Sequence, residues 1–187
     1  MKELSLNILD IAQNSIKADA AHIDVLLDET AQTLTLTIRD DGCGMRAEAV
    51  RGVTDPFFTT RTTRSVGMGV PLLKLAAEQT GGSLSVASVA SEDDPVAHGT
   101  TVQAVFYKNH LDFTPLGDIV STICTLIQGA PDVDWHFRHT CGAQCVELDT
   151  AQMREILGAD VPLDSFEVLN WIRQSLSEEY AGFNTTV

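Results

Sequence analysis

Asp40-Asp41-Gly42-Cys43-Gly44-Met45 is the stretch that decides how this chain is interpreted. It follows Leu34–Arg39, whose alternating apolar side chains predict a strand. An acidic residue at a strand end, then two glycines spaced by one residue, lets the backbone approach a flat ligand, because glycine has no Cβ and tolerates positive φ. An ordinary turn after a strand is the alternative. The rest of the chain is needed to decide between a turn and a binding loop.

Size and charge exclude several classes of protein. A chain of 187 residues can form one large or two small domains with a real core. The net charge is −14, and residues 111–187 contribute −9 of it, which argues against nucleic-acid or anionic-membrane binding. No apolar run approaches the roughly 20 residues that span a bilayer, and residues 1–20 do not resemble a signal peptide. We therefore expect a cytoplasmic protein.

The four cysteines do not follow zinc-finger spacing. They are Cys43, Cys124, Cys141 and Cys145. In a cytoplasmic protein we expect reduced thiols. Cys141 and Cys145 flank a predicted turn, so a metal or redox pair there stays open.

A polar stripe runs along the first predicted helix, residues 3–18. Its apolar residues fall on one half of the helical wheel, whereas Asn7, Asp10, Asn14 and Lys17 fall in a narrow arc on the other half. A solvated face normally mixes Glu, Lys and Gln. Because Asn and Asp are poorer helix formers, this arc suggests a functional role, and an ordinary solvated face is the alternative.

The order of predicted elements indicates an α+β fold. Strands at 22–28 and 33–39 precede a short helix at 46–52, a helix at 70–80 and strands at 83–88 and 99–106. This order predicts a two-layer α/β sandwich, a mixed sheet with helices on one face. We expect residues 1–107 to form this domain. Residues 111–187 are expected to form a small acidic α+β segment, with helices at 115–128, 150–157 and 165–180 and a hairpin of 133–139 and 144–149.

Several motifs together resemble the GHKL (Bergerat-fold) superfamily of ATP-binding domains. This superfamily includes sensor histidine kinases, anti-sigma serine kinases, type II topoisomerases and MutL-type mismatch-repair ATPases. The resemblance covers about residues 1–107. It implies the Bergerat fold, with ATP and Mg²⁺ as cofactors.

The first motif is Asp10-Ile11-Ala12-Gln13-Asn14-Ser15-Ile16-Lys17, which looks like the N-box. The resemblance implies that Asn14 holds Mg²⁺ through its side-chain oxygen and that Asp10 is the general base. The ATPases of the family use Glu at the position of Asp10, so efficient water activation is in doubt. Lys17 stands where histidine kinases often direct a Lys at the phosphates.

The hexapeptide at 40–45 matches the first glycine box, and Gly99-Thr100 matches the last one. By resemblance, Asp40 accepts a hydrogen bond from the adenine amino group. Gly42 and Gly44 let the backbone pass beside the ring, and Met45 completes this loop. The Thr100 hydroxyl is expected near adenine.

The remaining motifs lie between residues 56 and 69. Pro56-Phe57-Phe58-Thr59-Thr60-Arg61 looks like the kinase F-box, and a short lid follows it. Arg61 and Arg64 are candidates for the terminal phosphates, with a solvated lid as the alternative for each. Gly67-Met68-Gly69 is the second glycine box, and the free amides where the next helix begins can bind phosphate.

The resemblance implies an Mg²⁺-dependent ATP-binding protein. We expect it to hydrolyse ATP slowly or to pass the γ-phosphate to a separate protein. The acceptor is expected on another protein because the five histidines of this chain fall in strand or turn positions, where none is expected to be a phosphoacceptor. The alternative is a non-catalytic, ATP-gated interaction module. The acidic segment 111–187 suits partner docking, or a plain extension packed on the ATP-binding domain. The oligomeric state stays open.

Overall fold

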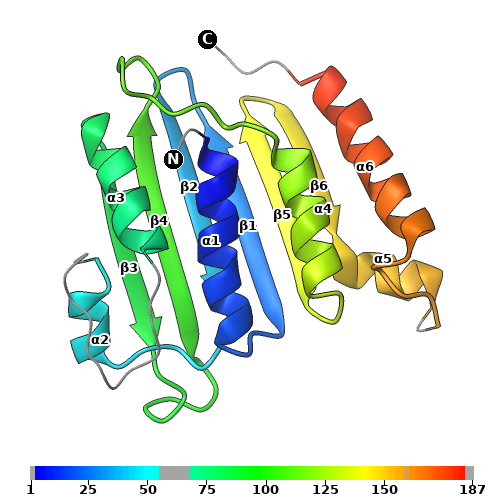
Figure 1. Cartoon of the computed structure of the whole chain (residues 1–187), viewed down its shortest axis with the longest axis horizontal. Helices are drawn as coiled ribbons and strands as arrows, with labels where there is room; N and C mark the ends of the chain where they lie inside the picture. The colour runs from blue at the N-terminus through cyan, green and yellow to red at the C-terminus, as the bar shows by residue number, and fades with distance from the viewer. Residues whose placement is uncertain (1–2, 55–67, 159, 184–187) are drawn as a thin grey trace.

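The computed structural model describes residues 3–54, 68–158 and 160–183. Figure 1 shows its helices and strands in chain order. They are α1 (Leu4–Lys17), β1 (His22–Glu29), β2 (Thr33–Asp40), α2 (Ala47–Gly52), α3 (Gly69–Gln79), β3 (Ser83–Val89), β4 (Gly99–Tyr107), α4 (Ile119–Gly129), β5 (Asp134–Cys141), β6 (Gln144–Asp149), α5 (Thr150–Leu157) and α6 (Phe166–Ala181).

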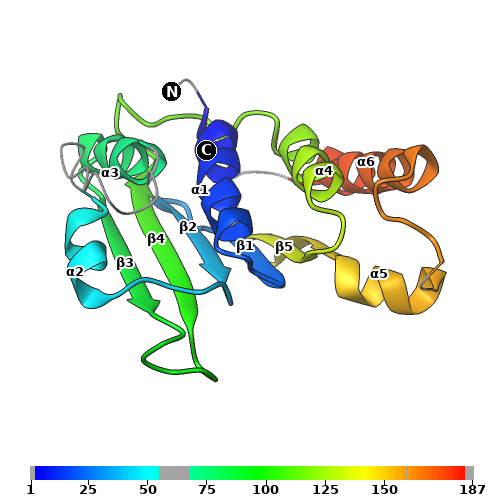
Figure 2. The same ribbon diagram turned by 60° about the horizontal axis from the view of Figure 1, so that its bottom comes forward.

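One mixed sheet of six strands carries the fold, in the order β3-β4-β2-β1-β5-β6. Strand β5 pairs with β1 in parallel, and the other neighbouring strands pair antiparallel. Helices α1, α3, α4 and α6 lie against one face of this sheet, as Figures 1 and 2 show. The predicted α+β, two-layer architecture with a mixed sheet is confirmed.

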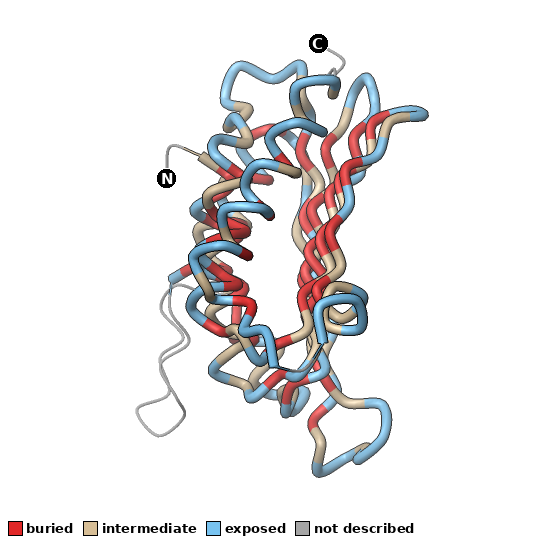
Figure 3. The backbone as a smooth tube through the Cα atoms, turned by 90° about the vertical axis from the view of Figure 1, so that its right-hand side faces the viewer, coloured by how far each residue is buried: buried red, intermediate tan, exposed pale blue. Residues whose placement is uncertain are grey.

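The core lies between the helix layer and the sheet. Alternate residues of β2 are buried, and they are Leu34, Leu36 and Ile38. They face the apolar side of α1, where Leu4, Ile8 and Ile11 are at most 2% exposed. Figure 3 shows the buried segments of both layers turned toward each other. The period-two and helical patterns of the sequence therefore meet in one core.

The start of α4 differs from the prediction. The expected helix began at Pro115, whereas α4 begins at Ile119. The Pro115 and Leu116 carbonyls instead accept hydrogen bonds from the first amides of α1, at 2.9 and 2.8 Å. Gly117 then adopts φ +77°, and Asp118 caps the helix by accepting from Ser121 N at 2.9 Å. Pro115 and Leu116 thus anchor the start of α1.

The two segments that were predicted as domains contribute to the same sheet. Glu29 of β1 pairs with Lys108, which follows β4, and accepts from His139 Nε2 of β5 at 3.2 Å. His139 Nδ1 lies 2.9 Å from the hydroxyl of Tyr180 on α6. His139 is fully buried, and burial lowers its pKa despite the neighbouring Glu29. The division at residues 107–111 itself stays a prediction.

A second polar network lies on the other face of the sheet. Asp24 is 3% exposed, and its carboxylate contacts His22, His136 and Arg39. Burial alone would raise the pKa of Asp24, but hydrogen bonds from these three side chains outweigh it and lower the pKa. His136 also contacts Glu147 Oε1 at 2.9 Å. Burial opposes protonation of His136, yet the two carboxylates raise its pKa.

Helices of the described residues are too short or too polar to cross a membrane.

Candidate functional site

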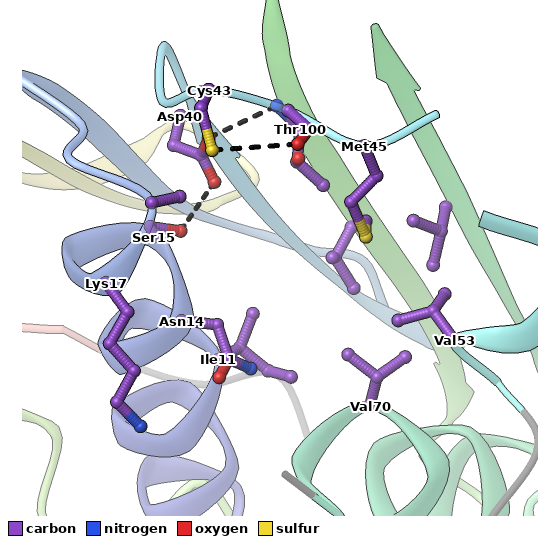
Figure 4. A pocket seen from close by; sticks show the side chains of 14 residues that line it. Ile11, Asn14, Ser15, Lys17, Asp40, Cys43, Met45, Val53, Val70 and Thr100 are labelled. Carbon is purple, nitrogen blue, oxygen red and sulfur yellow. Dashed lines mark hydrogen bonds between the residues drawn. The ribbon is translucent and has the colours of Figure 1, made fainter. Parts of the chain in front are cut away.

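A cavity of about 510 Å³ opens between α1, α3, the glycine-containing loop after β2, and strands β3 and β4. Figure 4 shows its lining from close by. The residues are Ile11, Asn14, Ser15, Lys17, Ala18, Asp40, Cys43, Gly44, Met45, Val53, Val70, Val86, Thr100 and Val102. Such a volume is typical of small-molecule sites, and so are mostly apolar walls with a few polar groups.

The Asp40 carboxylate is held by three donors. Its Oδ1 accepts from the amides of Gly42 and Thr100, at 3.1 and 3.2 Å. Its Oδ2 accepts from the Ser15 hydroxyl at 2.6 Å. Figure 4 shows Ser15, Asp40 and Thr100 meeting at one side of the cavity. Because an ionised carboxylate only accepts, its remaining lone pairs offer an oriented acceptor to a ligand amino group.

Ser88 connects the glycine loop to the last strand of the site. The Ser88 hydroxyl accepts from Met45 N, donates to the Gly99 carbonyl and lies against Thr100 Oγ1, each at 2.8 Å. A hydroxyl has a single proton, so when Ser88 donates to Gly99 the Thr100 hydroxyl donates to Ser88. The Thr100 side chain is thereby fixed beside Asp40.

The glycine loop is clamped by the connection between β3 and β4. Gly44 adopts φ +64°, and a Cβ on it would lie 1.8 Å from the Val89 carbonyl oxygen. The Cys43 carbonyl accepts from Ser91 N at 2.9 Å, and the Gly42 carbonyl lies 2.6 Å from His98 Nδ1. Positive φ and this close backbone contact explain why glycine stands at residue 44.

The polar arc of α1 reaches the cavity in part. Asn14 and Lys17 line it, whereas Asp10 is exposed one turn earlier and is absent from the described lining. Gly69, at the start of α3, packs beside Asp10, because a Cβ on it would lie 3.2 Å from Asp10 Cβ.

The predicted site residues fall into three groups. The structure brings Asn14, Lys17, Asp40, Gly44, Met45 and Thr100 together around the cavity. Four others are described but do not line it, namely Asp10, Gly42, Met68 and Gly69. Arg61, Arg64 and Gly67, together with the F-box at 56–61, lie outside the described residues.

Sequence reasoning missed two hydroxyls of the site, Ser15 and Ser88. Ser15 is 3% exposed, and the available signal in the sequence was a hydroxyl residue directly after the N-box Asn. Ser88 pairs with Thr100 across β3 and β4, and this register is not visible in the sequence. Three valines from α3, β3 and β4 (Val70, Val86 and Val102) were also missed as apolar lining.

Among residues 3–54, 68–158 and 160–183, no three His, Cys, Asp or Glu side chains are grouped so that they could hold a metal ion. Cys141 is buried and Cys145 is exposed, and both are free thiols.

The region that holds the cavity matches a known protein family. Residues 2–110 match the family described as histidine kinase-, DNA gyrase B- and HSP90-like ATPase. Sensor histidine kinase ZraS from Escherichia coli O157:H7 is 30% identical over 84 residues, which are 44% of this chain and 18% of that protein. The chain thus covers less than a fifth of this curated relative.

Two solved structures share the fold at low sequence identity. The Aquifex aeolicus MutL ATPase domain complexed with ADP has a TM-score of 0.55 and 12% identity, covering 84% of this chain and 69% of that one. The N-terminal domain of a DNA repair protein has a TM-score of 0.55 and 16% identity, covering 85% and 58%. These shares exceed the family match, so the shared fold extends beyond residue 110.

Proposed function

Because the chain belongs to the histidine kinase-, DNA gyrase B- and HSP90-like ATPase family, which makes residues 2–110 an ATP-binding domain, we propose that it acts on Mg²⁺-bound ATP in the cavity beside Asp40. It either hydrolyses ATP slowly or transfers the γ-phosphate to a separate protein. The observation that carries this proposal is the Asp40 carboxylate, which three donors orient as an acceptor at the cavity wall.

The residues around Asp40 fit an adenine base. An exocyclic amino group donates, and the carboxylate accepts without being able to donate. Figure 4 shows Met45, Val53 and Val70 on the side of the cavity opposite Asp40, where they offer apolar contact to a ring. A base with a carbonyl in place of the amino group would put two acceptors together, so the site favours adenine over hypoxanthine or guanine.

The residues on α1 fit the phosphate end of the nucleotide. Asn14 supplies a neutral oxygen, which suits Mg²⁺, and the phosphates complete the coordination. Lys17 supplies a cation on the same side of the cavity. We assign Arg61 and Arg64 to the terminal phosphates as a further part of the proposal. Bound Mg²⁺ neutralises phosphate charge, and the protein's contribution is to position these groups.

Asp10 is our candidate for the general base. It lies one helical turn before Asn14, so both side chains project from the same face of α1. Its carboxylate would take the proton from the attacking water or from an acceptor hydroxyl.

The proposed partner is another protein, and the four thiols support a cytoplasmic location.

Paired measurements on the full chain with Mg²⁺ test the proposal. ATP binding is titrated by calorimetry, and phosphate release is followed over hours. We expect binding that Asp40→Asn abolishes, because the amide NH₂ places a donor toward the amino group, and slow release that Asp10→Asn eliminates without loss of binding. Ser177→Ala, on the surface of α6, is the matched control. Failure of ATP to bind would overturn the proposal.

The second candidate is a non-catalytic, ATP-gated interaction module. The exposure of Asp10 outside the described cavity lining favours it, as does the shorter Asp in place of Glu. Under this candidate ATP binds, phosphate release stays at background, and Asp10→Asn changes neither binding nor release. The same two measurements therefore distinguish the candidates.

A further inference from the structure

Helix α6 is the last helix of the described chain, and the other described elements cover one side of it. Figures 1 and 2 show it beyond α4, along the outer strand β6. Its apolar stripe of Val168, Ile172 and Leu176 is buried. The flank that points away from the rest of the chain has no described element packed on it, so its side chains are available to a partner.

This outer flank carries a large apolar side chain between carboxylates. Glu167, Trp171, Gln174 and Glu178 are all exposed and follow one another at spacings of four, three and four residues. Such spacing places side chains along one line of a helix. Trp171 is 57% exposed, although tryptophan side chains are on average highly buried. Tryptophan is also enriched among the residues that dominate the binding energy of protein interfaces. Phe166, at the first position of α6, is 79% exposed and adds apolar surface at that end.

Two arginines, one on α6 and one on α5, already bond to other groups of this chain. Arg173, the one Lys or Arg of α6, donates from Nη1 to Ser121 Oγ on α4 at 3.0 Å. Arg154 of α5 pairs with Asp134 at 3.0 Å and donates to the Pro131 carbonyl at 2.6 Å. Arg173 is thus held toward α4, and Glu167 and Glu178 are the charged residues in line with Trp171 on the outer flank.

We propose that the outer flank of α6 is a docking site for an amphipathic helix of another protein that carries Lys or Arg beside apolar side chains. An apolar side chain of the partner covers Trp171, and a cation over the indole face is favourable. The cations of the partner pair with Glu167 and Glu178. A second copy of this chain does not fit, because the same flank would bring glutamates together in a protein of net charge −14. A membrane surface does not fit either, because anionic lipids repel the same carboxylates.

Trp171 itself reports on docking. The chain has two tryptophans, and Trp135 is 2% exposed, so the water-exposed emission comes from Trp171. The probe is a synthetic amphipathic peptide of leucine and lysine, about 18 residues long so that it forms five helical turns. Two control peptides are compared with it. One is a scrambled peptide of the same composition, and the other is a leucine–glutamate peptide of the same pattern.

We expect the leucine–lysine peptide to bind the full chain and to shift the emission of Trp171 to shorter wavelength. The other two peptides should bind at least tenfold more weakly. Calorimetry should show at least a tenfold loss of affinity in Trp171→Ala and in the double variant Glu167→Lys/Glu178→Lys. The control double variant Glu48→Lys/Asp93→Lys changes the net charge equally at exposed sites far from α6 and should bind as the unmodified chain does.

Three results would overturn the proposal. One is equal binding of the ordered and scrambled leucine–lysine peptides, which would indicate non-specific charge attraction. Another is unchanged peptide affinity in the α6 variants. The third is a dimer in sedimentation, or binding to vesicles of anionic lipid, that Trp171→Ala abolishes, because another occupant would then hold this flank. None of these measurements involves ATP, so they stand apart from the proposed function.

Discussion

The hydroxyl of Ser15 lies 2.6 Å from Asp40 Oδ2 and donates a hydrogen bond to it across 25 residues of sequence. This contact joins α1 to the end of β2 at the cavity. The amides of Gly42 and Thr100 hold the other carboxylate oxygen. Ser15 is therefore a positioning residue for the carboxylate that we propose to recognise adenine.

Replacing Ser15 with Ala should weaken ATP binding by about tenfold, because the lost hydrogen bond is made to a charged group and contributes about 1.5 kcal/mol. Calorimetric titration with Mg²⁺ and ATP measures the change, and Ser177→Ala on the surface of α6 is the control. An affinity for ATP equal to that of the unmodified chain would show that Asp40 does not depend on Ser15.

Replacing Gly44 with Ala should destabilise the fold far more than the same change at Gly142. Both glycines have positive φ, +64° and +60°, so the conformational cost to Ala is similar. A Cβ at Gly44 would lie 1.8 Å from the Val89 carbonyl oxygen, whereas nothing lies within 4 Å at Gly142. We expect the free energy of unfolding in urea to fall by at least about 2 kcal/mol more for Gly44→Ala. Equal losses would contradict the close packing of the glycine loop.

His136 should make the protein more stable at pH 6 than at pH 8. Its pKa is raised in the folded state, so its stabilising contribution is complete below the unfolded pKa of 6.5 and is lost as the pH rises through the folded pKa. His136→Gln should remove this part of the pH dependence. Because the side chain is 22% exposed, we expect the difference to be below about 1 kcal/mol.

Urea unfolding of both proteins at the two pH values measures this difference. The opposite contribution of the buried His139 is present in both proteins and cancels. His110→Gln, at an exposed site, is the control. A pH dependence that is unchanged in His136→Gln would be incompatible with the network around Asp24.

Replacing Tyr180 with Phe should lower the free energy of unfolding by about 1 to 3 kcal/mol, because it leaves His139 Nδ1 buried without a partner. The second tyrosine provides the control. Tyr107 is 47% exposed, and Tyr107→Phe should change stability by less than about 0.5 kcal/mol. Thermal and urea unfolding check both variants, and equal effects would argue against the buried hydrogen bond.

Local patterns in the sequence predicted most of the fold. The alternation in 34–39 and the apolar half of 3–18 each have a single solution, because one face must be buried. The glycine spacing in 42–44 also predicted a loop against the cavity, where Gly44 has the positive φ that the residue type allows. Asp149 caps α5 by accepting hydrogen bonds from the amides of residues 151 and 152, the role that Asp favours directly before a helix. Ser165 precedes α6 without such a bond from its side chain.

Features that depend on distant pairing could not be predicted. The parallel pairing of β5 with β1 joins residues more than a hundred positions apart, and nothing local to either strand indicates it. The same holds for Ser88, which enters the site only because β3 and β4 place it opposite Thr100. The predicted start of α4 was wrong because the Pro115 and Leu116 carbonyls accept hydrogen bonds from α1. This tertiary contact overrides helical propensity.

The pairing of β5 with β1 has a consequence for the way the chain protects its own backbone. All eight residues of β1, from His22 to Glu29, are in register with β5. A chain cut after β4 would leave this row of amide and carbonyl groups as an open sheet edge, a template on which other chains add strands and aggregate. Residues 134–149 close that edge, and β6 then becomes the outer strand, where Glu147 N bonds to Glu179 of α6. Strands β5 and β6 of the C-terminal segment thus cover a sheet edge that would otherwise be open to strand addition.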